Sequence, residues 1–287
     1  MKEDELQRRV SLITDVIILL IIVFITILLI QKLDVNQYAD LKQVSSLLDD
    51  SSKSSVNYEN EMYVKKIKKE YGVDILYGKN AKEFANKLEA VELYDENIIN
   101  NNLKIIYKAL QKYPIDLFDK VKINEYPMYV MLFEKFDNNN LALASRTSLN
   151  VFRIYLSNND KFERSFHHEL YHILEYWMEN KERNIYDDWF KFNPDYFKYE
   201  VDITKLDTKY VYNISAFSNF DMYFVTKYSK TSSKEDRAEI FAELMMLNKS
   251  QDYLKDGSNI RKKVDEIYST INKYLTHGDF NFSNILK

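Results

Sequence analysis

Three of the four histidines in the chain lie close together, in the segment FHHELYHILEY from Phe166 to Tyr176. His168 and His172 are four residues apart, so on a helix both imidazoles project from the same face. Two histidines at this spacing can bind one zinc ion, and Glu169 can then accept a proton from water that the metal activates. The pattern is HExxH, and it predicts metal-assisted hydrolysis.

A zinc site that keeps one position open for water needs a third protein ligand. The best source is YSKTSSKEDRAEIFAE, residues 228–243, where Glu235 and Glu239 are four residues apart. We expect Glu235 to be the third ligand and Glu239 to accept a hydrogen bond from a ligating imidazole, which fixes its tautomer. Two alternatives stay open. Glu239 could be the ligand, and Ser232 with Glu235 could form only a helix-capping box. We expect Glu175, on the histidine-bearing helix, to be a surface carboxylate.

These residues resemble a signature of the lethal-factor-like zinc metallopeptidases, which include the catalytic domain of anthrax lethal factor and the bacterial Pro-Pro endopeptidases. That family has an HExxH helix, then a tyrosine seven residues before a glutamate ligand that opens a helix containing an Ala-Glu pair. The matching residues are His168, Glu169, His172, Tyr228, Glu235, Ala238 and Glu239.

The resemblance covers residues 149–247 and implies a zincin-like fold with one Zn²⁺ per chain. It also implies that the Tyr228 hydroxyl donates a hydrogen bond to the oxyanion formed during hydrolysis. Asp236 and Arg237 stand where family members tend to have aromatic residues. The resemblance therefore does not extend to a preference for Pro-Pro sequences.

The elements that must position these residues are mostly helices. Apolar residues recur at helical spacing over 162–178 and 235–247, the two segments that carry the site. Short apolar runs bounded by turn residues indicate a few strands. The other expected helices are 63–70, 81–93, 98–112 and 264–274, and the other expected strands are 73–77, 129–136 and 142–145. Helices with one small sheet predict an α+β domain.

Residues 151–156 (VFRIYL) directly precede the histidine-bearing helix and alternate in the manner of a strand. We expect this strand to lie at the edge of the sheet and to pair with an extended substrate. Val151, Arg153 and Tyr155, which share one face, are then candidate substrate-binding residues. An ordinary core strand is the alternative.

The N-terminal residues form a candidate membrane span. Residues 16–30 are apolar apart from Thr26, and the preceding residues bring the segment to the ~20 residues that cross a bilayer. No small-residue cleavage site follows the apolar run. An uncleaved signal anchor over residues 11–31 is therefore favoured over a removed signal peptide.

Basic residues are slightly more frequent before the span than after it, which predicts a cytoplasmic tail over residues 1–10. The remainder of the chain would then face outward from the cell membrane. A Ser-, Asp- and Asn-rich stretch within residues 32–60 is expected to be a flexible stalk. Residues 61–287 would form one zinc metallopeptidase-like domain.

Composition excludes several classes of function. The chain has 287 residues, with 40 Lys and Arg against 44 Asp and Glu and a net charge of −4. Nucleic-acid-binding domains are normally basic, so we expect no nucleic-acid partner. The lack of cysteine excludes disulfides, thiolate metal sites and cysteine nucleophiles. Four scattered glycines do not form a dinucleotide-binding loop.

These observations favour a membrane-anchored, extracytoplasmic zinc endopeptidase that acts on a peptide or protein substrate. One alternative is a catalytically silent zincin fold that serves as a binding module, which the presence of Glu169 and of every proposed ligand disfavours. Another is a membrane-tethered helical domain without metal. It predicts that His168 and Glu235 lie far apart.

Overall fold

The chain is seen in a computed structural model that describes residues 55–121, 126–138, 140–146, 151–209, 211, 222–247, 254–255 and 257–276. The expected tail, the expected span over residues 11–31 and most of the expected stalk lie outside these residues. Among the residues described, no helix has the length and apolar character needed to cross a bilayer. Helix α2 (Ser55–Tyr71) begins within the stretch expected to be a stalk, so regular structure starts earlier than composition suggested.

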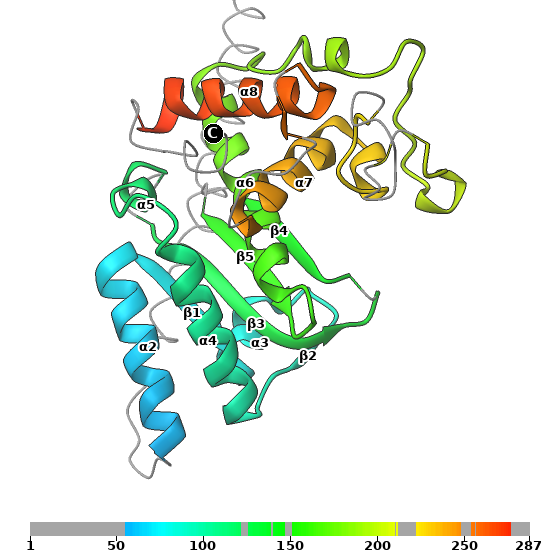
Figure 1. Ribbon diagram of the computed structural model, residues 1–287. Coiled ribbons are helices and arrows are strands. Elements are labelled where there is room, and N and C mark those ends of the chain that lie inside the picture. The colour runs from blue at the N-terminus through cyan, green and yellow to red at the C-terminus, as the bar shows by residue number, and fades with distance from the viewer. Residues whose placement is uncertain are drawn as a thin grey trace, which may run out of the picture. The chain divides into compact units, whose positions relative to one another are not determined.

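Five strands form one mixed sheet in the described part of the chain, with the main order β1-β3-β5-β4 (Figure 1). Strands β1, β3 and β5 run parallel, β4 is antiparallel to β5, and β2 is antiparallel to β3. The central strand β3 reads MYVMLFEKF, a nearly continuous apolar run, because both faces of the sheet are covered. The strands are β1 (Val73–Tyr77), β2 (Ala90–Glu92), β3 (Met128–Phe136), β4 (Ala142–Arg146) and β5 (Phe152–Ser157).

Helices cover the two faces of the sheet unequally. Helices α2, α4 (Glu96–Leu110) and α6 (Phe162–Lys181) contribute to the main core, on the face that carries Ile154. The short helix α3 (Gly78–Phe84) packs on the opposite face with Tyr155 in a smaller core. The fold is therefore a helix-rich α+β arrangement with one small sheet, as the sequence predicts.

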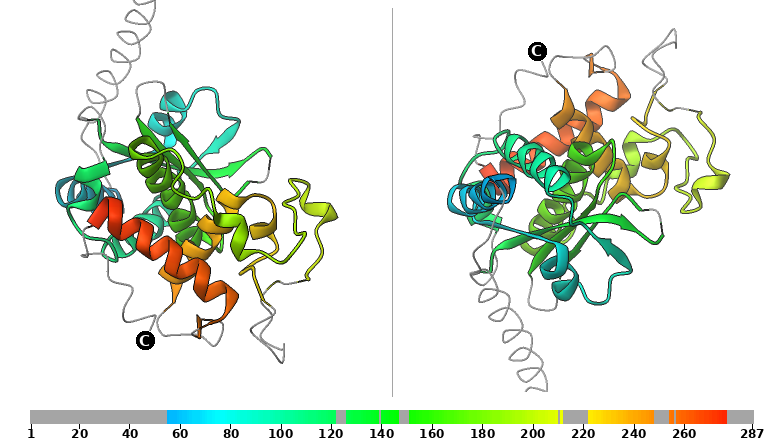
Figure 2. Two further views of the ribbon diagram at one scale, coloured as in Figure 1. Left: turned by 90° about the horizontal axis from the view of Figure 1, so that it is seen from above. Right: turned by 90° about the horizontal axis from the view of Figure 1, so that it is seen from below.

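Two further helices complete the framework of the site. Helix α7 (Ser233–Met246) packs along α6, and α8 (Asn259–Ile271) packs against α7 (Figures 1 and 2). Ser258 caps α8, because its side chain accepts a hydrogen bond from the backbone N–H of Arg261. The shorter helical segments are α5 (Leu117–Val121), η1 (Trp189–Phe192), η2 (Ile203–Lys205), η4 (Tyr228–Lys230) and η6 (Asn272–Thr276).

The expected helix over residues 81–93 is wrong. Helix α3 ends at Phe84, and residues 90–92 form β2 instead. Ala90 pairs with Phe136 of β3 and is buried there, so tertiary pairing overrides the helical spacing of the apolar residues.

The expectation that residues 151–156 form an edge strand is also wrong. Strand β5 pairs with β3 on one side and β4 on the other, so the edge next to α6 is β4. Arg153 lies over the ring of Phe84 at 4.5 Å, and the Tyr155 hydroxyl accepts a hydrogen bond from Ser145 at 3.2 Å. Both side chains belong to the face opposite α6, and Val151 is buried. A strand's place in a sheet depends on distant segments, which its own alternation does not encode.

Candidate metal centre

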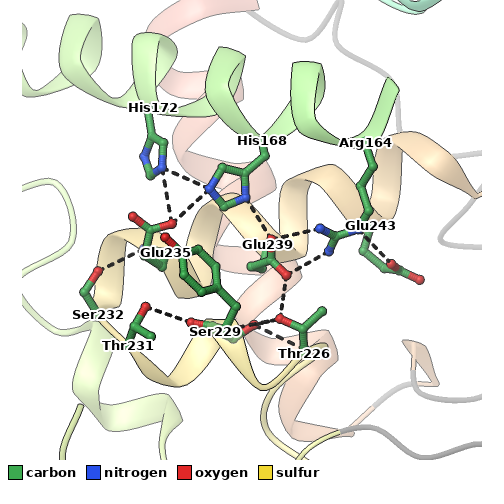
Figure 3. Close-up of polar contacts among 11 residues, drawn as sticks. Arg164, His168, His172, Thr226, Ser229, Thr231, Ser232, Glu235, Glu239 and Glu243 are labelled. Atoms are coloured by element: carbon green, nitrogen blue, oxygen red, sulfur yellow. Dashed lines mark hydrogen bonds and ion pairs between the residues drawn. The ribbon is translucent and has the colours of Figure 1, made fainter. Parts of the chain in front are cut away.

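Helices α6 and α7 bring together three side chains that could bind a metal, although some sixty residues separate the two histidines from Glu235 along the chain. Glu235 Oε2 lies 2.9 Å from His168 Nε2 and 3.5 Å from His172 Nε2, and the two Nε2 atoms are 3.2 Å apart (Figure 3). The alternative of a helical domain with His168 and Glu235 far apart is therefore excluded.

The geometry of this triangle fits a zinc ion. Ligand atoms about 2.0–2.1 Å from a tetrahedral zinc lie roughly 3.3 Å from one another. The three observed separations of 2.9, 3.2 and 3.5 Å bracket that value. Two imidazoles and one carboxylate are also the donor set of catalytic zinc sites that leave a fourth position open. The residues present therefore suit zinc as a cofactor.

Glu235 faces the imidazoles while its backbone starts a helix. Ser232 is the N-cap of α7, and its hydroxyl accepts a hydrogen bond from the Glu235 backbone N–H at 3.1 Å. The Glu235 carboxylate is directed to the two histidines instead of back to the cap (Figure 3). Ser232 therefore caps the helix through the Glu235 backbone, while the Glu235 side chain stays free of the capping role and faces the two imidazoles.

Glu239, one turn further along α7, lies behind His168. Its Oε1 accepts a hydrogen bond from His168 Nδ1 at 2.8 Å, which leaves Nε2 directed at Glu235. Arg164 holds both carboxylate oxygens of Glu239 at 2.9 Å, and the Thr226 hydroxyl donates to Oε2 at 2.5 Å. Glu239 therefore lies in the position expected for the group that orients a ligating imidazole.

Electrostatics in this cluster favour a proton on His168 when no metal is bound. Burial disfavours the charged ring, but hydrogen bonds to Glu235 and Glu239 outweigh burial and raise the pKa of His168 to about 10. Burial likewise acts to raise the pKa of Glu235, but hydrogen bonds with both imidazoles lower it to about 2. A metal at this site must therefore displace a proton from a strongly basic imidazole.

Glu169 lies beside the triangle and not in it. Its side chain is buried, and burial raises its carboxyl pKa against the opposing charges of His168 and His172. A backbone hydrogen bond from Ala144 of β4 acts in the opposite direction to burial. A carboxyl group with a raised pKa accepts a proton more readily near pH 7, which suits a role in proton transfer.

A cleft of about 960 Å³ runs past these groups. Residues 140–144, at the edge strand β4, form one wall, and the turn that carries Tyr228 forms part of the other. The histidines, Glu169 and Glu235 line the cleft, whereas Val151, Arg153 and Tyr155 do not. Val151 lies just before β5, and Arg153 and Tyr155 lie within it, so their predicted role in substrate binding has no support from the cleft and stays a prediction.

Tyr228 stands at the start of η4, next to the metal-binding side chains. Its ring centroid lies 6.0 Å from that of His168, and the side chain is 43% exposed towards the cleft. Burial and the nearby charge of Glu235 raise the pKa of Tyr228 to about 12. The hydroxyl is therefore protonated at neutral pH and can donate a hydrogen bond.

Two buried ion pairs next to Glu235 were not foreseen. Glu175 is 1% exposed and accepts a hydrogen bond from Arg237 Nε at 2.7 Å, so the expectation that it is a surface carboxylate is wrong. Asp236 is fully buried with Lys263 of α8 at 2.6 Å. Asp236 and Arg237, where the sequence departs from the pattern of the family it resembles, were the signal that could have indicated these pairs.

Neither a protein-family model nor a curated protein matches the chain. Among solved structures, the chain is similar to a candidate zinc-binding metallo-peptidase from Bacteroides caccae. The two share 13% sequence identity with a TM-score of 0.52, over 81% of this chain and 91% of that one. At this identity the likeness concerns the fold alone, and it shows that the chain shares the fold of that protein.

Proposed function

We propose that the protein is a zinc-dependent endopeptidase in which His168, His172 and Glu235 hold the metal. The observation that carries the proposal is the triangle of ligand atoms, 2.9–3.5 Å apart, contributed by two helices that are distant in sequence. Among metallopeptidases, the lethal-factor-like group is the best candidate subgroup, because Tyr228 precedes Glu235 by seven residues.

Each group around the cleft has a part in peptide hydrolysis. Zinc supplies Lewis acidity, which makes water more acidic and a peptide carbonyl more electrophilic. Glu169 accepts the proton of the attacking water and passes it to the leaving amine, which its raised pKa favours. Tyr228 donates a hydrogen bond to the negative charge that develops on the carbonyl oxygen.

Strand β4 is the element that would bind the substrate backbone. It is paired with β5 on one side, and its other side lines the cleft. The unpaired backbone groups of an edge strand can pair with an extended peptide. This replaces β5 in the role that the sequence assigned to it and suits cleavage within a peptide chain.

The location of the protein is part of the same proposal. Residues 11–31 would anchor the chain in the cell membrane, with residues 1–10 in the cytoplasm and the peptidase domain outside. This rests on the apolar run in the sequence and on the distribution of basic residues around it. Substrates would then be peptides or proteins at the cell surface.

The test uses the full-length chain in detergent, with Glu169→Gln as the matched variant. Both proteins should retain close to one equivalent of zinc by mass spectrometry, because Glu169 is not a ligand. Only the wild type should cleave a peptide library, and a chelator should abolish that cleavage. Zinc binding without any cleavage would favour the silent binding module. Failure of the wild type to bind zinc would refute the metal site.

A further inference from the structure

The Glu239 carboxylate connects the metal centre to a second part of the cleft. It is 4% exposed, and each of its oxygens is used twice. Oε1 accepts from His168 Nδ1 and from Arg164, while Oε2 accepts from Arg164 and from the Thr226 hydroxyl (Figure 3). The position of the Glu239 carboxylate therefore depends on Thr226 as well as on Arg164.

The Thr226 hydroxyl oxygen also accepts a hydrogen bond, and this bond lies within the turn that carries Thr226. Thr226 Oγ1 accepts a hydrogen bond from the backbone N–H of Ser229 at 3.2 Å. Its backbone N–H in turn donates to Ser229 Oγ at 3.4 Å. These bonds close the turn at the start of η4, whose first residue, Tyr228, lines the cleft. A hydroxyl can donate once and accept twice, so one Thr226 side chain serves both contacts.

We propose that Thr226 is a positioning residue that couples the orientation of the metal ligand His168 to the placement of Tyr228, through its hydrogen bonds to Glu239 and to the Ser229 backbone. The inference rests on the proposed function and deepens it. The Thr226 hydroxyl then helps to fix both the orientation of the His168 imidazole, which would bind the metal, and the position of the Tyr228 hydroxyl, which would donate to the substrate oxyanion.

The other groups at Glu239 and in the turn make different contacts. Arg164 holds both carboxylate oxygens of Glu239 from α6, and it also forms an ion pair with Glu243 of α7. The Thr231 hydroxyl lies in the same turn and donates to the Tyr228 carbonyl at 2.8 Å, a contact within the turn that does not involve Glu239. Thr231 therefore offers a matched control.

The test measures zinc affinity by competition with a chromophoric chelator for full-length Thr226→Val, Thr226→Ser and Thr231→Val. Valine keeps the shape of threonine and removes the hydroxyl without changing charge, so electrostatic effects on the metal stay small. We expect Thr226→Val to bind zinc about tenfold more weakly, the lower end of the range for groups behind a metal-binding histidine. Thr226→Ser and Thr231→Val should bind zinc as the wild type does.

A second readout follows Tyr228 without any metal or substrate. In protein labelled with fluorotyrosine, the ¹⁹F resonance of Tyr228 is identified by its loss in Tyr228→Phe. Thr226→Val should shift or broaden this resonance, and Thr226→Ser should restore it. A residue that only stabilised the fold would change neither this resonance nor zinc affinity once folding is verified by circular dichroism.

The outcomes separate the two proposals. If the wild type binds zinc and Thr226→Val binds it equally well with an unchanged Tyr228 resonance, the coupling role is refuted and the peptidase proposal stands. If the wild type binds no zinc, the proposed function fails and this inference fails with it. Should Thr226→Val not fold, Thr226→Ala removes the same hydroxyl and is judged by the same measurements.

Discussion

Zinc binding should release a proton from His168. In the metal-free protein this imidazole lies between two carboxylates, with Nδ1 at 2.8 Å from Glu239 and Nε2 at 2.9 Å from Glu235. Both nitrogens then carry protons, since each faces an acceptor. A metal ligand needs the lone pair of Nε2, whereas Nδ1–H stays on Glu239. One proton must therefore leave the ring for each metal that binds.

The size of this effect follows from the pKa of His168, which is about 10. At pH 7 the ring is protonated in all but roughly one molecule in 10³, so competition by the proton lowers apparent zinc affinity by about 10³. Apparent affinity should rise by about tenfold per pH unit between about pH 7.5 and pH 9. Glu235, with a pKa of about 2, contributes no proton in that range.

Isothermal titration calorimetry can count the proton. Titrations of zinc into metal-free protein at pH 7, in buffers of different ionisation enthalpy, should give close to one proton released per zinc. Glu239→Gln removes the carboxylate that accepts from Nδ1, so it should lower the pKa of His168 and weaken the dependence on pH. Zinc affinity that is independent of pH, with no proton released by the wild type, would refute this reasoning.

The remaining expectations concern the cleft tyrosine, a buried ion pair and the pH dependence of stability. Tyr228→Phe should leave zinc affinity unchanged and lower kcat by about 10²–10³-fold, the usual cost of removing one donor to a developing oxyanion. Steady-state kinetics check this, and an unchanged kcat would remove the hydroxyl from the reaction. Arg237→Ala should lower the free energy of unfolding by about 3–5 kcal/mol, because Glu175 stays buried without its partner. The double variant Arg237→Met with Glu175→Leu should lower the free energy of unfolding much less. If urea denaturation gives the same loss for the single and the double variant, the unpaired charge of Glu175 is not the cause. In the metal-free protein, the raised pKa of His168 stabilises the folded state fully below about pH 6.5, and this contribution is lost as pH rises through about 10. A melting temperature that stays constant over that interval in the presence of chelator would contradict the assignment.

Local sequence signals predicted the elements that carry the site. Helical spacing indicated a helix over residues 162–178, and α6 extends from Phe162 to Lys181. Helical spacing also indicated a helix over residues 235–247, and α7 extends from Ser233 to Met246. Strand β1 was expected over residues 73–77 and has those bounds. Such features depend on neighbours within a few residues, which the sequence displays directly.

Features that depend on distant segments were not predictable in the same way. The alternation in β5 shows that it is a strand but not that β4 covers its other side. The contact between Thr226 and Glu239 joins a turn to a helix, and no spacing rule relates a threonine to a glutamate thirteen residues later. Glu175 was expected at the helix surface because one helix rarely supplies three metal ligands, whereas the partner that allows its burial, Arg237, comes from another helix.

The buried ion pair of Asp236 and Lys263 links helix α8 to the candidate metal centre. Asp236 directly follows Glu235, and its carboxylate also accepts hydrogen bonds from Trp189 and Tyr199. A shortened chain that ends before α8 would keep every residue of the zinc signature, yet it would leave an unbalanced negative charge in the interior next to a ligand. Fragments of related sequences that contain only the signature residues are therefore poor candidates for autonomous peptidases.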